Sequence, residues 1–118
     1  MMVAAILLLA ACQSKNKQTQ DFIPGTYVNS AKGDYSIAND TLLIRSIDDT
    51  HYQITRRTTY QAIRNDKRLP AHHKEEKLNA VWDKDKQELD EPITGRIFRF
   101  DADKKILLIN QAVYRKLN

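Results

Sequence analysis

The sequence has few of the residues that cross-link small domains or build active sites. It contains 1 Cys, 3 Gly and 3 Pro in 118 residues. A single cysteine excludes an intramolecular disulfide, so the fold must be stable from its core alone. The chain has no phosphate-cradling glycine loop, no Gly-x-Ser-x-Gly elbow and no His-Glu-x-x-His helix. Carboxylate pairs occur only in turn-like segments, so we predict no enzyme, no catalytic residue and no cofactor.

Charged side chains are also missing from the start of the chain. Residues Met1 to Ala11 include none, and their apolar part runs only from Val3 to Ala11. That run is about half as long as a membrane-spanning helix, and it fits the hydrophobic region of an export signal. Two small residues, Ala10 and Ala11, come directly before Cys12.

Leu9, Ala10, Ala11 and Cys12 resemble the lipobox of bacterial lipoproteins, in which the cysteine receives a diacylglycerol before a peptidase cleaves in front of it. The resemblance implies a signal peptide over residues 1–11 and a lipidated Cys12 held at a membrane. Each buried methylene contributes about 0.8 kcal/mol, so two or three acyl chains anchor a protein stably. The segment before the apolar run departs from the usual pattern, because it lacks Lys and Arg. No Asp follows the cysteine, which favours the outer membrane over the inner membrane.

The segment after Cys12 is polar. Residues 13–21 contain no apolar side chain, so we predict that residues 12–21 form the lipidated end and a flexible tether. The remaining residues, 22–118, suit one small domain with a modest positive charge, since the whole chain carries a net charge of +4.

Alternation of polar and apolar residues dominates this domain. From His51 to Ile63, Tyr52, Ile54 and Tyr60 fall on one face, which predicts a half-buried antiparallel strand. Arg56 interrupts the apolar face, which leaves open a bend, a bulge or a charge that points into a cavity. A first strand opens at Gly25, with Tyr27 facing the core. Further strands are expected over residues 35–37, 41–47, 75–82, 87–91, 96–100, 106–109 and 112–117.

Short polar turns join these strands, and the longest break, residues 64–74, has room for a short helical turn. We therefore predict an all-β fold, a small antiparallel up-and-down meander of about seven or eight strands curled into a barrel or half-barrel.

Gly25-Thr26-Tyr27 resembles the start of the first strand in lipocalin-like domains, which begins Gly-x-Trp, with Tyr27 in place of the tryptophan. The layout of lipobox, polar segment and small β domain is also similar to small bacterial envelope lipoproteins, including uncharacterised ones encoded on conjugative elements. The lipocalin resemblance implies a barrel that carries a small apolar ligand. No site residue is transferred by either resemblance.

Two groups of residues are candidates for a site. Tyr52, Tyr60 and Trp82 would line a ligand cavity in an open barrel, or else fill the core, as a small domain requires. A basic group would form a contact surface for an anion, a glycan or a protein, or else a solvated loop; its members are Arg57, Arg64, Lys67 and Arg68.

Metal and nucleic-acid sites are not expected. His72 and His73 are adjacent, and neighbours in an extended chain point to opposite faces. The acidic turn at Asp83 and Asp85 lacks the spacing of a calcium loop. Tyr52 and Tyr60 with two arginines resemble a base-stacking surface, but an exported domain rarely meets nucleic acid.

The sequence thus predicts a membrane-anchored lipoprotein of the bacterial cell envelope, with a non-catalytic structural or protein-interaction role and an envelope protein as partner. The alternative is a lipocalin-like carrier of a small apolar ligand. An empty apolar cavity would favour the carrier, and a filled core would favour the interaction role.

Overall fold

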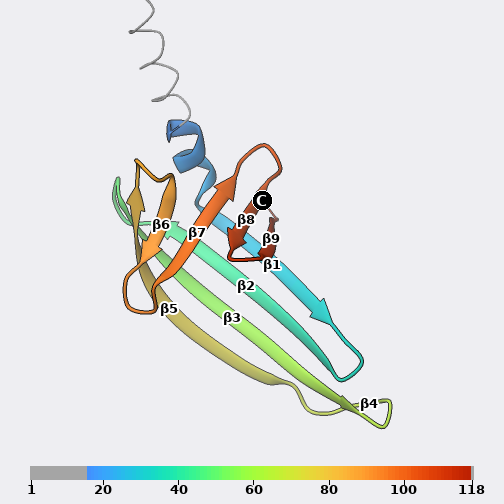
Figure 1. Cartoon of the computed structure of the whole chain (residues 1–118). Coiled ribbons are helices and arrows are strands. Elements are labelled where there is room, and N and C mark those ends of the chain that lie inside the picture. The colour runs from blue at the N-terminus through green and yellow to red at the C-terminus, as the bar shows by residue number, and fades with distance from the viewer. Residues whose placement is uncertain (1–15, 118) are drawn as a thin grey trace, which may run out of the picture.

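The computed structural model describes residues 16–117, in which eight antiparallel strands close into a barrel and a ninth short strand is added at its edge. Each barrel strand pairs with the next one along the chain, and β1 closes the cylinder by pairing with both β2 and β9 (Figure 1). This confirms the predicted all-β up-and-down meander in its closed form. The strands are β1 (Gly25–Lys32), β2 (Ser36–Ser46), β3 (His51–Arg64), β4 (Lys67–Arg68), β5 (His72–Asp83), β6 (Glu88–Glu91), β7 (Arg96–Asp101), β8 (Ile106–Ile109) and β9 (Ala112–Lys116).

Two segments differ from the expected pattern. Separate strands were expected over residues 35–37 and 41–47, but β2 runs through Asn39 and Asp40 between them without a break. Asp40 lies opposite Asn29 of β1 and Thr58 of β3, and its buried carboxylate finds partners there, so tertiary contacts override the turn preference of the pair. Between residues 64 and 74, where the sequence left room for a short helical turn, the chain makes the two-residue strand β4.

Inward-facing side chains fill the barrel. Tyr27, Ile54 and Phe98 are among the fully buried residues. The inward position predicted for Tyr27 is therefore confirmed. The rings of Phe22, Tyr27 and Phe100 meet edge to face, with centroids 6.0–6.4 Å apart. Burying a large apolar side chain stabilises a fold by roughly 1.5–3 kcal/mol, so these contacts provide the stability that no disulfide supplies. The core consists of Ile23, Tyr27, Leu42, Ile44, Tyr52, Ile54, Leu78, Ala80, Trp82, Leu89, Phe98, Leu107 and Tyr114.

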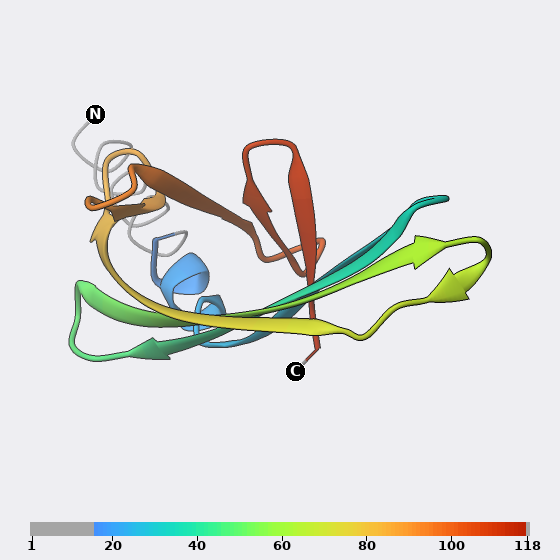
Figure 2. The same ribbon diagram turned by 90° about the horizontal axis from the view of Figure 1, so that it is seen from below.

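A short helical segment over residues 16–22 packs against one end of the barrel (Figure 2). The Asn16 Oδ1 atom accepts hydrogen bonds from Trp82 Nε1 at 3.0 Å and from Gln87 Nε2 at 2.9 Å, and Gln20 Nε2 donates to the Asp49 carbonyl at 2.8 Å. The prediction of a flexible tether is therefore wrong for residues 16–21, because side-chain amides hold this polar segment on the barrel. The proposed signal peptide and Cys12 lie outside the described residues.

Four strands continue beyond the other end of the barrel. β1 pairs with β9 only at Tyr27 and Val28, and β5 pairs with β6 only from Val81 to Asp83. Past these points β1, β2, β3 and β5 leave the barrel as a curved sheet, which the β3–β4 hairpin ends (Figure 2). We call residues 29–40 and 58–74 the projecting sheet, and its turns at residues 33–35 and 65–66, with their flanking residues, the tip.

Candidate functional site

A cluster of polar side chains lies inside the barrel where the projecting sheet begins. Asp40 of β2 accepts hydrogen bonds from Arg56 Nε at 3.0 and 2.9 Å, and Arg56 Nη2 lies 2.8 Å from its Oδ2 atom. Thr58 Oγ1 donates to Asp40 Oδ1 at 2.8 Å, and the Tyr114 hydroxyl of β9 donates to Oδ2. The inward charge that the Arg56 position suggested is therefore real, and it is neutralised by a carboxylate from the neighbouring strand.

The cluster extends across a gap in the barrel wall. Arg96, at the start of β7, donates through Nη1 to Glu76 Oε1 of β5 at 2.8 Å. Arg56 Nη1 lies 3.6 Å from the same Glu76 oxygen. Because β6 is short, β5 and β7 are not joined by backbone pairing here, and these side chains connect the two strands instead.

The pKa values of this cluster follow from burial and hydrogen bonding. Burial alone would raise the pKa of Asp40, but the hydrogen bonds from Arg56, Tyr114 and Thr58 together outweigh it and lower that pKa. Burial, followed by the bond to Asp40, raises the pKa of Tyr114 to about 12. Asp40 is therefore charged and Tyr114 neutral at pH 7. The carboxylate is already bound by four donor atoms, which suits a structural role better than that of a general base. We call Asp40, Arg56 and Tyr114, which hold three strands together in this way, the polar lock.

The three predicted aromatic residues do not form one cluster. Tyr52 and Trp82 are 3% and 6% exposed and belong to the packed core, whereas Tyr60 is 45% exposed on the projecting sheet. Tyr52 and Trp82 thus occupy the positions that the core-packing alternative assigned to them, and Tyr60 lies beyond the barrel.

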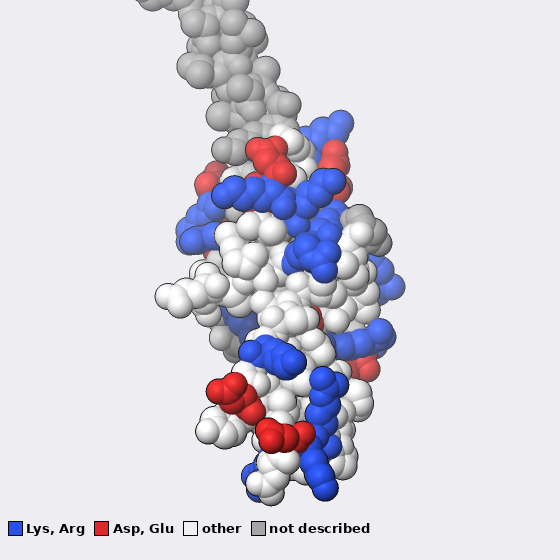
Figure 3. All heavy atoms as spheres, turned by 90° about the vertical axis from the view of Figure 1, so that its right-hand side faces the viewer, with Lys and Arg blue, Asp and Glu red and all other residues white. Residues whose placement is uncertain are grey.

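The four predicted basic residues divide into two places. Arg64 and Lys67 lie opposite each other in the β3–β4 hairpin at the tip, and Arg68 follows on the other face of the hairpin. Arg57 lies further back on the outer side of β3, where its Nε atom is 3.6 Å from Glu75 Oε1. The tip also carries Tyr35, which is 82% exposed. Seen from one side, Lys and Arg side chains reach the free end of the molecule, where acidic side chains also lie (Figure 3).

The histidines and acidic turns make local contacts. His51 Nδ1 lies 2.8 Å from Asp48 Oδ1, and His73 Nδ1 lies 3.2 Å from Thr59 Oγ1. Within residues 16–117, no group of three His, Cys, Asp or Glu side chains is arranged to hold a metal ion. The same range contains no helix that is long and apolar enough to span a membrane.

These features define a class, a small closed up-and-down β-barrel consistent with a lipocalin-like fold, with a polar lock at one end and a sheet that projects beyond it. No protein-family model, no curated protein and no solved structure matches the chain.

Proposed function

We propose that this chain is a membrane-anchored lipoprotein of the bacterial cell envelope whose barrel has no catalytic role and presents the tip of its projecting sheet to a protein partner. The observation that carries the proposal is the combination of a filled barrel with an exposed sheet that leaves it. A barrel built to carry a ligand needs interior space, and this one uses its interior for packing.

The filled core weighs against the carrier alternative. The side chains that would line a cavity are fully buried and expose no surface to solvent or to an interior space large enough for water. They include Leu42, Ile54, Leu89 and Leu107. A ligand site of the usual size needs about 300–1,000 Å³ of interior space. The polar lock of Asp40, Arg56 and Tyr114 also occupies the end of the barrel from which the sheet projects, and the helix over residues 16–22 packs against the other end.

The tip has the composition of a contact surface for an acidic protein. Lys32, Arg64, Lys67 and Arg68 outnumber its two acidic residues, Asp34 and Asp66. The Ile63 amide donates to the Tyr35 carbonyl at 2.8 Å, which holds the two tip turns side by side. Tyrosine and arginine are the residues that most often dominate the energy of protein interfaces. An acidic segment would therefore find both charge and an exposed ring here.

The docked helix sets the distance between the proposed anchor and the barrel. Only three residues separate Cys12 from Asn16, and the four steps between their Cα atoms span at most about 14 Å. A lipid on Cys12 would therefore keep the helix-capped end close to the bilayer. The tip lies at the other end of β3, about 43 Å along the strand from His51 to Arg64, so it would face away from that membrane (Figure 1).

The anchoring part of the proposal is tested with the Cys12→Ser variant of the full chain. We expect the natural chain to incorporate labelled palmitate and to sediment with membranes, and the variant to lose the label. Equal labelling of both chains, or cleavage of the variant by the lipoprotein peptidase, would refute the anchor.

The contact surface is tested by affinity capture of envelope proteins in neutral detergent. The tip variant Arg64→Gln/Lys67→Gln/Arg68→Gln is compared with a charge-matched variant in turns at the helix-capped end, Lys84→Gln/Lys86→Gln/Lys104→Gln. We expect one envelope protein to be retained by the natural chain and the control and lost with the tip variant. Equal retention by all three chains, or loss with the control only, would contradict the assignment of the tip.

A further inference from the structure

We propose that the outer face of the long sheet binds an acidic polysaccharide, a hydroxyl-rich polymer with carboxylate, sulfate or phosphate groups along its length. Residues that lie opposite one another on paired strands form a row across the sheet. The outer face comprises the outward side chains of β1 to β5, from the row of Arg45, Gln53 and Asn79 to the row of Ile63 and Arg68. The inference rests on the proposed envelope location. Its surface overlaps the tip only at Lys32 and Arg68, and the face variant tested below changes neither of them.

The strand registers define this face. Residues directly opposite each other on paired strands point to the same side, and successive residues alternate between sides. Leu42 and Ile54 point into the barrel, so Leu43 and Thr55, which lie opposite each other, point outward. Hydroxyl and amide groups dominate the outward set, which includes Asn39, Thr41, Gln53, Thr55, Thr59 and Gln61.

The charges on this face are nearly all of one sign. Five exposed cations share it with a single carboxylate, Glu75. Across the whole chain Lys and Arg outnumber Asp and Glu by only 19 to 15, so this balance is not that of the average surface. The face alone carries a net charge of +4, which equals that of the whole chain and leaves the rest of the molecule neutral overall. The five cations are Lys32, Arg45, Arg57, Arg68 and Lys77.

The cations are arranged in a line rather than in a point cluster. Arg45 lies opposite Gln53, Lys77 lies opposite Thr55, and Arg57 follows two residues later on β3 itself. The remaining two, Lys32 and Arg68, lie in the rows that contain Gln61 and Ile63. From Gln53 to Ile63 the line is about 33 Å long, and neighbouring rows are about 7 Å apart. A line of charges of this length fits an extended polymer better than a single small anion.

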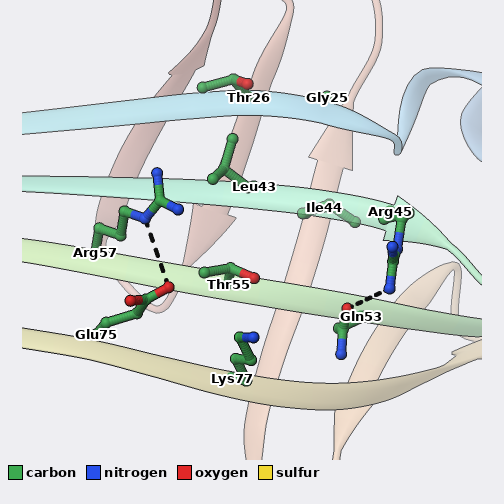
Figure 4. A pocket seen from close by; sticks show the side chains of 10 residues that line it. All are labelled: Gly25, Thr26, Leu43, Ile44, Arg45, Gln53, Thr55, Arg57, Glu75 and Lys77. Atoms are coloured by element: carbon green, nitrogen blue, oxygen red, sulfur yellow. Dashed lines mark hydrogen bonds and ion pairs between the residues drawn. The ribbon is translucent and has the colours of Figure 1, made fainter.

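The line begins at a shallow hollow of about 440 Å³ in the outer face (Figure 4). Arg45, Arg57 and Lys77 surround it, and the hydroxyl of Thr55 lies at its centre. Arg45 is held in place by its hydrogen bond to Gln53 Oε1 at 2.6 Å. Arg57 and Glu75 are both more than half exposed, so their 3.6 Å ion pair is weak and yields readily to a ligand anion. The hollow therefore offers one sugar unit both cations and hydrogen-bonding groups.

The side chains of this face favour a polysaccharide over nucleic acid. None of the outward side chains in the rows from Gln53 to Gln61 is Phe, Tyr or Trp, and the exposed Tyr35 lies beyond them at the tip. Proteins that bind single-stranded nucleic acid rely on such rings to stack the bases. Hydroxyl and amide groups instead match the many hydroxyls of a sugar chain, while the cations match its acidic groups.

The test measures binding of the full chain, in neutral detergent, to fluorescently labelled heparin and polyuronate oligosaccharides by anisotropy. Neutral dextran, single-stranded DNA and poly-glutamate serve as comparison polymers. The face variant Arg45→Gln/Arg57→Gln/Lys77→Gln is compared with Lys84→Gln/Lys86→Gln/Lys104→Gln, which removes the same charge elsewhere. All six side chains are exposed, so both variants are expected to fold, and circular dichroism checks this.

We expect both acidic oligosaccharides to bind with an affinity that falls as salt rises, and dextran not to bind. The face variant should bind roughly 10–100-fold more weakly at about 0.1 M salt and show a shallower salt dependence, because three counterion-releasing contacts are gone. The control should stay within about twofold. Equal loss in both variants, or tighter binding of DNA or poly-glutamate than of the oligosaccharides, would overturn the inference. The tip variant's protein capture is measured separately, so failure of either proposal is recognised independently.

Discussion

Replacing Tyr114 with Phe tests the polar lock most cleanly, because it removes one hydroxyl and leaves the buried ring in place. That hydroxyl donates to the charged Asp40 carboxylate from a side chain that is 4% exposed. A hydrogen bond to a charged group contributes about 1.5–3 kcal/mol. We therefore expect Tyr114→Phe to lower the free energy of unfolding by about 2 kcal/mol, and the melting temperature by roughly 10 °C.

Urea and thermal unfolding, followed by circular dichroism, measure this loss. Tyr60→Phe is the matched control, because its hydroxyl lies on an exposed residue of the projecting sheet and should change stability by less than about 0.5 kcal/mol. In an Asp40→Ala background, the effect of Tyr114→Phe should largely disappear, since the acceptor is gone. An undiminished effect in that background, or no effect in the natural chain, would refute the lock.

Three further predictions concern the same fold. The raised pKa of Tyr114 means that its contribution to stability is present below about pH 10 and is lost as the pH rises towards 12, so unfolding titrations should show a smaller alkaline decline for Tyr114→Phe. Phe98→Ala should cost about 3–5 kcal/mol in unfolding free energy because it opens a cavity at a residue with no exposed surface, whereas Ile97→Ala on the outer wall should cost much less. Asn16→Ala should cost about 1–2 kcal/mol and shift the fluorescence of Trp82, since the indole loses its acceptor; an unchanged spectrum would show that the helix is not held there.

The sequence predicts much of this fold because the barrel strands carry their own signals. The alternation from His51 to Ile63 marks β3 almost to the residue, and the polar turn before Ile106 marks β8. What it misses depends on tertiary partners. Asp40 reads as a turn residue until Arg56, 16 residues later in the chain and on the adjacent strand β3, supplies its counter-charge.

The candidate sites are harder to predict because they depend on strand length and register. Tyr52 and Tyr60 share a face, as predicted, but they lie eight positions apart along β3, a distance of about 26 Å. One is therefore in the core, and the other lies past the end of the barrel. Likewise, the polar segment at residues 16–21 has no apolar periodicity, and only the amide contacts of Asn16 and Gln20 reveal that it is docked.

The central proposal, a filled and anchored barrel that offers the tip of its projecting sheet to an envelope protein, is tested most directly by photo-crosslinking in living cells. A photoreactive amino acid is placed at Tyr35 on the tip and, as a control, at Ile97 on the barrel wall; the two residues are 82% and 42% exposed. The proposal predicts one protein adduct from position 35, its loss when Arg64, Lys67 and Arg68 are changed to Gln, and no such adduct from position 97. An adduct only from position 97, or an adduct from position 35 that survives the loss of the tip charges, would contradict it.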